Sequence, residues 1–233
     1  MEKKALQING IPSVLWGNPS EKGFIAVHGN QSHKMDRPIE LLAENACARG
    51  YQVVSFDLPE HGDRKQESTL CKVQNCVEEL REILQYAEKN WKQIRLFANS
   101  MGAYFSLLAY AGEALDGAWF LSPVVDMQRI IQNMMGWFHV NEQQLQEQQT
   151  VATPIGQTLY WDYYVYVQTH PVCEWGIPTH ILYGSRDELC EADTISKFVR
   201  QFSCQLETVP EAEHYFHTPE QLQVLNRWMQ KTF

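Results

Sequence analysis

The sequence lacks several features that mark whole classes of protein. It has no apolar run of about 18 residues, the length that a membrane-spanning helix needs. Lysines at positions 3 and 4 are followed by no apolar segment, so we expect no secretory signal and a cytoplasmic location. Basic residues are also few, since 19 Lys and Arg stand against 28 Asp and Glu, giving a net charge of −9. Because an acidic chain repels phosphate backbones, we expect no nucleic-acid partner. No pattern specifies an oligomeric state.

Metal-binding patterns are missing as well. None of the six cysteines forms a C-x-x-C pair, and no group of histidines has the spacing of a zinc site. We therefore expect reduced thiols that pack as small apolar side chains, and neither a metal nor an organic cofactor. The cysteines are Cys47, Cys71, Cys76, Cys173, Cys190 and Cys204.

Short apolar runs alternate with longer amphipathic segments along most of the chain. Strand patterns occupy residues 23–28, 51–57, 94–98, 117–122, 178–184 and 204–209. Helical spacing of apolar residues occupies 37–50, 73–87, 101–111, 192–202 and 222–229. This alternation predicts an α/β fold in which helices cover both faces of a mostly parallel sheet. The length of 233 residues suits a single domain over 1–233. Ligands of such sheets bind beyond the carboxyl ends of the strands.

Residues 127–170 interrupt the alternation. An amphipathic helix, a glutamine-rich piece and an aromatic-rich stretch follow one another there, and we interpret them as a cap insertion over the carboxyl edge of the sheet. Aromatic runs at helical spacing are usually core, but a cap has little core, so some rings must face the crevice or the main domain. A partly apolar substrate pocket is therefore expected. Its candidate residues are Trp137, Tyr160, Trp161 and Tyr164.

One serine stands at the corner between a predicted strand and a predicted helix. The stretch F-A-N-S-M-G-A, residues 97–103, places Ser100 between the small residues Ala98 and Gly102. A serine hydroxyl is a poor nucleophile that needs an oriented general base and donors for the oxyanion. A tight turn with small neighbours, the nucleophile elbow G-x-S-x-G, exposes the hydroxyl; here alanine replaces the first glycine. The alternative role for such a serine is a plain helix N-cap.

A nucleophile elbow predicts an acid and then a histidine, each after a later strand. Asp187 follows the strand 178–184, and His214 follows the strand 204–209. Two alternatives remain open: Asp126, after the strand that precedes the cap, is a second candidate acid, and His217 is a second candidate base. His217 precedes Thr218 and Pro219, a pair typical of a helix start.

The oxyanion hole is expected to use backbone N–H groups. A glycine turn ends an early strand in V-H-G-N, residues 27–30, and brings the N–H of Asn30 to the same edge of the sheet. The N–H of Met101, at the start of the helix after Ser100, is the second predicted donor.

The ordered motifs H-G-N (28–30), D-L-P-E-H-G (57–62), A-N-S-M-G (98–102), G-S-R-D (184–187) and A-E-H (212–214) resemble those of the α/β-hydrolase superfamily. Within it, the chain is similar to the small serine hydrolases of the monoacylglycerol-lipase-like and serine-aminopeptidase-like branch. The resemblance covers nearly the whole chain. It implies Ser100 as nucleophile, His214 as base and Asp187 as the orienting carboxylate, with a cap at 127–170. It implies structural roles for His28, Asp57 and His61.

We expect the substrate to be a small-molecule carboxylic ester with a small to medium, partly apolar acyl group. The same catalytic triad also serves amide, thioester and carbon–carbon bond hydrolysis, and acyl transfer to an alcohol. Haloalkane and epoxide chemistry is disfavoured, because the family members that perform it use an aspartate where this chain has Ser100. A non-catalytic ligand receptor on the same fold is a further alternative.

Overall fold

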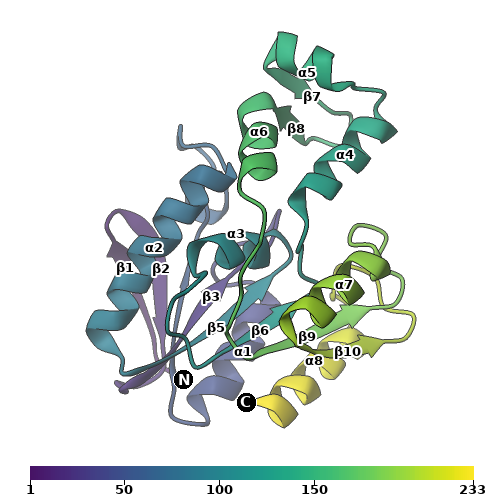
Figure 1. Cartoon of the computed structure of the whole chain (residues 1–233). Helices are drawn as coiled ribbons and strands as arrows, with labels where there is room; N and C mark the ends of the chain where they lie inside the picture. The colour runs from purple at the N-terminus through teal and green to yellow at the C-terminus, as the bar shows by residue number, and fades with distance from the viewer.

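The computed structural model describes residues 1–233, and at its centre lies an eight-stranded sheet of order β1-β2-β4-β3-β5-β6-β9-β10 (Figure 1). From β4 to β10 in that order the neighbouring strands run parallel. The α/β-hydrolase architecture predicted from the sequence is confirmed. The strands are β1 (Lys3–Ile8), β2 (Ile11–Trp16), β3 (Lys22–Val27), β4 (Gln52–Phe56), β5 (Gln93–Asn99), β6 (Gly117–Leu121), β9 (Thr179–Gly184) and β10 (Gln205–Val209).

The first two strands form an antiparallel hairpin that was not predicted. Asn9 and Gly10 connect them with φ angles of 49° and 88°, and Ile8 pairs with Ile11 across the turn. Asn-Gly with both residues at positive φ is the type I′ hairpin turn, whose twist matches that of the strands. The dipeptide was therefore a readable signal for this edge of the sheet.

Helices cover both faces of the sheet. One apolar cluster contains side chains of α1 and α8, which contact each other, and a larger cluster on the other face contains side chains of α2, α3 and α7 (Figure 1). The predicted helix over 37–50 is shorter than expected: it ends at Cys47, and Gly50 lies beyond it with φ 77°. The helices of the two faces are α1 (Arg37–Cys47), α2 (Val73–Asn90), α3 (Met101–Ala109), α7 (Ala192–Phe202) and α8 (Pro219–Thr232); a short 3₁₀ turn, η1, spans Gly62–Arg64.

The insertion between β6 and β9 stands clear of the sheet, at the top of Figure 1. We call its elements the cap segment: α4 (Met127–Trp137), α5 (Glu142–Gln148), β7 (Thr150–Ala152), β8 (Thr158–Tyr160) and α6 (Trp161–Thr169). The small β7–β8 hairpin was not predicted, whereas the aromatic-rich stretch supplies β8 and α6. None of the helices in the structure combines the length and the apolarity that crossing a bilayer requires.

Candidate active site

Ser100 occupies a strained corner between β5 and α3. Its φ of 52° and ψ of −120° lie in a region that residues with a side chain rarely adopt. The backbone is held there by its neighbours: the Ser100 N–H donates to the Leu121 carbonyl at 3.0 Å, and its own carbonyl accepts from Val124 at 3.0 Å. The Ser100 side chain makes no capping hydrogen bond to α3, so the N-cap alternative is wrong.

Small residues permit this corner. A Cβ atom on Gly102 would lie 2.4 Å from the His28 carbonyl oxygen and 2.9 Å from the Val27 side chain, so no other residue fits without a shift of the backbone. Ala98 pairs with Val27 across the sheet and is fully buried. Position 98 therefore accommodates one methyl group, and the alanine that replaces glycine in the elbow pattern is tolerated.

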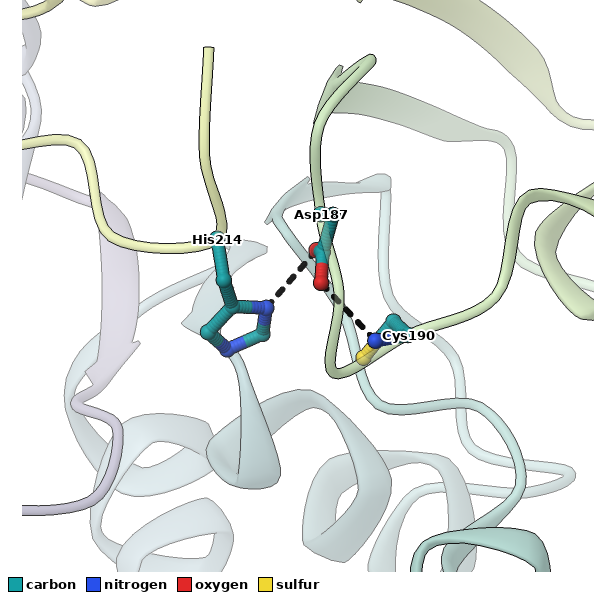
Figure 2. A group of neighbouring side chains, drawn as sticks. All are labelled: Asp187, Cys190 and His214. Carbon is teal, nitrogen blue, oxygen red and sulfur yellow. Dashed lines mark hydrogen bonds and ion pairs between the residues drawn. The ribbon is translucent and has the colours of Figure 1, made fainter.

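Ser100, His214 and Asp187 form a continuous relay of hydrogen bonds. The Ser100 Oγ lies 2.8 Å from His214 Nε2, and His214 Nδ1 lies 2.7 Å from Asp187 Oδ2, the second contact being drawn in Figure 2. Because an ionised carboxylate only accepts, Nδ1 carries the ring proton and Nε2 is free to accept the serine proton. The Asp187 side chain is fully buried, while that of His214 keeps 21% of its surface exposed. The histidine ring that contacts Ser100 is therefore partly accessible to solvent.

The Asp187 carboxylate is fixed by its own turn. Its Oδ1 accepts the backbone N–H groups of Leu189 at 2.9 Å and Cys190 at 2.8 Å, and Figure 2 shows the second of these. Such Asx-type bonds to the two following N–H groups are a common property of aspartate in turns. Sequence reasoning missed this role of residues 189 and 190, although an aspartate just after a strand was the available signal.

A close backbone approach joins the loops that carry the acid and the base. A Cβ atom on Gly184 would lie 2.4 Å from the Ala212 carbonyl oxygen, so glycine is required at the end of β9. The Arg186 N–H donates to the same Ala212 oxygen at 2.8 Å. The parallel pairing of β9 and β10 therefore delivers both side chains to one point.

The two alternative residues are engaged elsewhere. Asp126 is the N-cap of α4, where its Oδ1 accepts the Arg129 N–H at 2.9 Å. His217 is exposed and stacks on Tyr215, while Thr218 caps α8 as expected. The structure therefore brings Asp187 and His214 to Ser100, and it brings neither alternative there.

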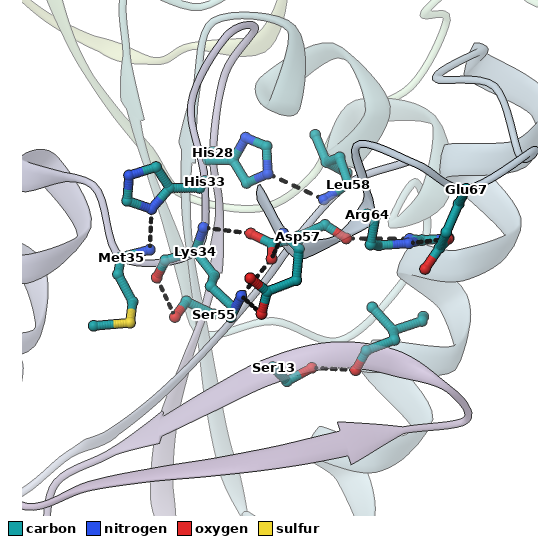
Figure 3. Close-up of polar contacts among 12 residues, drawn as sticks. Ser13, His28, His33, Lys34, Met35, Ser55, Asp57, Leu58, Arg64 and Glu67 are labelled. Carbon is teal, nitrogen blue, oxygen red and sulfur yellow. Dashed lines mark hydrogen bonds and ion pairs between the residues drawn. The ribbon is translucent and has the colours of Figure 1, made fainter. Parts of the chain in front are cut away.

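The predicted oxyanion donors lie at the same edge. Asn30 donates its backbone N–H to no acceptor within the protein, and Met101 is the first residue of α3, whose N–H has no intrahelical acceptor. His28 stabilises the loop that carries Asn30. It is fully buried and donates from Nδ1 to the Gly29 carbonyl at 2.7 Å. Its Nε2 accepts the Leu58 N–H at 3.0 Å, as Figure 3 shows.

A second set of contacts ties this loop to the turn after β4. Asp57 is buried and accepts the Lys34 N–H at 2.8 Å together with the Lys34 ammonium group (Figure 3). It also accepts the Asp63 N–H at 2.9 Å. Burial alone would raise the pKa of Asp57, but the bonds from Lys34 and Asp63 outweigh it and the pKa is lowered. His61 Nε2 accepts the Gln31 N–H at 3.1 Å. These contacts agree with the structural roles expected for Asp57 and His61.

The burial of His28 makes stability depend on pH. Burial lowers the pKa of His28 from 6.5 to about 3, so below pH 6.5 the unfolded chain binds a proton that the folded chain does not. Stability rises with pH where the unfolded state binds more protons, so it is lost as pH falls from 6.5 toward 3. At pH 5 we expect a loss of about 2 kcal/mol from this group, since one pKa unit corresponds to about 1.4 kcal/mol.

Urea unfolding at about pH 7 and pH 5 measures this effect. The variant His28→Gln is the control, because it removes the titrating ring while every other group stays. We expect the free energy of unfolding of the variant to fall by about 2 kcal/mol less than that of the wild type between the two pH values. Equal pH dependence in the two proteins would contradict the assignment of a neutral, buried His28.

The four aromatic candidates for the pocket lie in the cap segment. Trp137 is 53% exposed at the end of α4, and Tyr164 is 3% exposed, with its hydroxyl accepting from Gln132 at 3.4 Å. Trp161 packs on Tyr164 with ring centroids 6.1 Å apart, and the ammonium of Lys72 lies 4.3 Å above the ring of Tyr160. Tyr164 therefore packs inside the cap segment. That these residues line a substrate pocket stays a prediction.

A recess that was not predicted lies beside the Asp187 turn. Arg129 and Glu191 form an ion pair at 2.9 Å in its wall, and both side chains are partly exposed. The recess lies between the start of α4 and the turn that carries Asp187, so the first helix of the cap segment contacts that turn there. The recess is lined among others by Val125, Asp126, Ile130, Leu189 and Cys190.

The site also holds three potential metal ligands, since Asp187, Cys190 and His214 offer ligand atoms within 4.8 Å of one another. The hydrogen bonds that Asp187 accepts and the protonation of Cys190 favour a catalytic relay here over a metal site. Both oxygens of Asp187 already accept hydrogen bonds, one of them from His214. Burial raises the pKa of the Cys190 thiol well above its usual value, and a protonated thiol is a poor ligand.

Comparison with known proteins places the chain in a family. The family model described as serine aminopeptidase, S33, matches residues 18–158, more than half of the chain. The chain belongs to this family. It is therefore an α/β hydrolase and a serine hydrolase enzyme. The matched region includes Ser100 and Asn30 but ends before Asp187 and His214, so the family match itself does not cover these two residues.

Solved structures share the fold across nearly the whole chain. Est1E from Butyrivibrio proteoclasticus, with ferulic acid bound, has a TM-score of 0.78 at 20% identity, covering 98% of this chain and 96% of its own. The mouse alpha/beta hydrolase domain-containing protein 10 has a TM-score of 0.76 at 13% identity, covering 99% and 98%. An esterase from Pyrococcus furiosus has a TM-score of 0.70 at 18% identity, covering 99% and 88%. No curated protein sequence gives a match.

Proposed function

We propose that this serine hydrolase cleaves carboxylic esters through an acyl-enzyme on Ser100. The observation that carries the proposal is the relay from Ser100 Oγ through both ring nitrogens of His214 to the buried carboxylate of Asp187, at 2.8 Å and 2.7 Å. These three residues form the proposed catalytic triad. The strained backbone of Ser100 supports it, because strain of this kind is retained where it positions a reactive group.

Each residue then has one role in the reaction. Ser100 Oγ attacks the ester carbonyl while His214 Nε2 takes the hydroxyl proton, and Asp187 holds the ring in the required tautomer and stabilises the imidazolium. The N–H groups of Asn30 and Met101 donate to the oxyanion, aided by the N-terminal end of α3. His214 returns the proton to the departing alcohol. It then activates the water that hydrolyses the acyl-enzyme.

The cap segment, residues 127–169, is proposed to bound the acyl pocket. It joins β6 and β9, two strands whose carboxyl ends flank the site, so it leaves the sheet beside Ser100. Its aromatic side chains favour a small to medium, partly apolar acyl group. The bound ferulic acid of Est1E suggests that an ester of an aromatic carboxylic acid belongs in the substrate panel, although the likeness between the two chains is one of fold.

A panel of p-nitrophenyl esters from acetyl to decanoyl, with methyl ferulate and the matching p-nitroanilides and acyl thioesters, tests this proposal. We expect kcat/KM to be highest for a short or medium acyl ester, with the anilide and the thioester of the same acyl group turned over more slowly. Faster turnover of the anilide or the thioester would move the assignment to an amidase or thioesterase. Saturable binding of the esters without turnover would instead favour a receptor.

A further inference from the structure

Two cysteines outside the proposed triad lie in direct contact. Cys71 precedes α2, Cys76 lies in its first turns, and their sulfur atoms are 3.8 Å apart. Cys76 is fully buried, whereas Cys71 is partly exposed. A disulfide needs a sulfur separation of about 2 Å, so closing this pair requires the two sulfurs to approach each other by about 2 Å. No other two of the six cysteines have their sulfurs in such contact.

The two thiols have unequal acidity. A hydrogen bond from the Cys76 thiol lowers the pKa of Cys71 most, and although burial opposes it, the pKa of Cys71 lies below its usual value. Burial raises the pKa of Cys76 well above its usual value. Cys71 is therefore the more acidic of the two thiols and the one that more readily forms the nucleophilic thiolate, beside a protonated Cys76.

The cysteine pair lies between the loop that carries the proposed oxyanion donor Asn30 and the cap segment. His61, beside Cys71, accepts the Gln31 N–H next to Asn30, and the Glu60 carboxylate accepts the Cys71 N–H at 2.7 Å. On the other side, Tyr163 of α6 lies near both thiols. Helices α2 and α6 contact each other there, and they lie side by side in Figure 1.

We propose that Cys71 and Cys76 are a redox-active pair that a hydroperoxide converts into a disulfide. The Cys71 thiolate attacks the peroxide, the O–O bond breaks, and an S–O bond forms, which gives a sulfenic acid and an alkoxide that takes a proton from water. The Cys76 sulfur then attacks the Cys71 sulfur, and the departing hydroxide takes the Cys76 proton to form water. Overall, two thiols and one hydroperoxide yield one disulfide, one alcohol and one water.

The disulfide lowers the hydrolytic activity, a consequence that rests on the proposed function. Drawing the two sulfurs together moves the start of α2 relative to His61 and α6, and His61 holds the residue next to the oxyanion donor Asn30. Because a misplacement of about 1 Å in a catalytic group can reduce the rate by about a hundredfold, we expect a loss of about tenfold or more.

The experiment treats the intact protein with limiting hydrogen peroxide, alkylates the remaining thiols, and digests with trypsin. Cleavage after Lys72 separates the two cysteines, so the disulfide appears as a cross-link between peptides 66–72 and 73–81. We expect this cross-link in the wild type and in Cys173→Ser, which removes an exposed cysteine. We expect it to vanish with dithiothreitol, and a dimedone adduct on Cys71 to replace it in Cys76→Ser.

The rate of ester hydrolysis is followed in the same samples. We expect it to fall as the cross-link forms, to recover with dithiothreitol, and to persist under peroxide in Cys71→Ser. Oxidation of Cys173 without formation of the Cys71–Cys76 cross-link would overturn the inference. A cross-link that forms but leaves the rate of ester hydrolysis unchanged would overturn its regulatory part. Absence of hydrolysis before oxidation counts against the proposed function alone, because the cross-link is read by mass.

Discussion

Replacing Ser100 with alanine lowers kcat by about 10,000-fold to 1,000,000-fold, because the attacking oxygen is gone and only oxyanion donors and binding remain. The fold should persist, since the hydroxyl makes a hydrogen bond only to His214 and alanine can take the same backbone position. Ester hydrolysis and far-ultraviolet circular dichroism measure the two quantities together. Loss of activity with an unchanged spectrum is the expected result.

Ser106→Ala is the matched control for that variant. Ser106 lies on the same helix and is buried, but its Oγ donates to the Gly102 carbonyl at 2.7 Å and takes no part in the relay. Its removal is expected to change kcat by less than about threefold while lowering stability by about 1 kcal/mol. Substantial turnover by Ser100→Ala, or an equal loss in both variants, would mean that the chemistry does not use Ser100.

Asp187→Asn should lower kcat by about 10,000-fold. An amide in place of the carboxylate no longer holds His214 with its proton on Nδ1, and it removes the charge that stabilises the imidazolium. The two backbone N–H groups of the turn can still donate to the amide oxygen, so the loop should keep its shape. A kcat against pH profile for the variant and the wild type is the measurement.

Asp126→Asn is the matched control for Asp187→Asn. Asp126→Asn keeps the N-cap of α4, because asparagine caps helices as well as aspartate, so neither stability nor kcat should change appreciably. The two substitutions therefore distinguish the acid that orients His214 from the one that caps α4. A large loss in Asp126→Asn with little effect of Asp187→Asn would reverse the assignment.

The fold and the candidate triad could be predicted from the sequence because both depend on local signals. Alternation of strand and helix periods predicts the parallel sheet, and parallel strands place residues that follow them at one edge, as with Asp187 and His214. The N-terminal hairpin was missed although Asn9-Gly10 signalled it. β1 is mostly exposed, and β2 has Pro12 and Ser13 among its apolar residues, so neither strand has the continuous apolar run of a buried strand.

Other features depend on contacts between distant segments. The pairing of His28 with Leu58, and of His61 with Gln31, joins residues about 30 positions apart, which no local pattern reveals. The cap segment presents the same difficulty, because aromatic side chains at helical spacing pack inward or face a ligand according to the tertiary arrangement. Tyr164 proves to be buried and Trp137 exposed, a difference that their sequence context did not contain.

Labelling with a fluorophosphonate, followed by tandem mass spectrometry of the tryptic peptide 96–129, tests most directly whether Ser100 is an activated nucleophile. That peptide also contains Ser106 and Ser122, which serve as internal controls. An adduct on Ser100 alone, lost in Ser100→Ala and greatly slowed in Asp187→Asn, is the predicted result. An adduct on another residue, or none on the folded wild-type protein, would contradict the account.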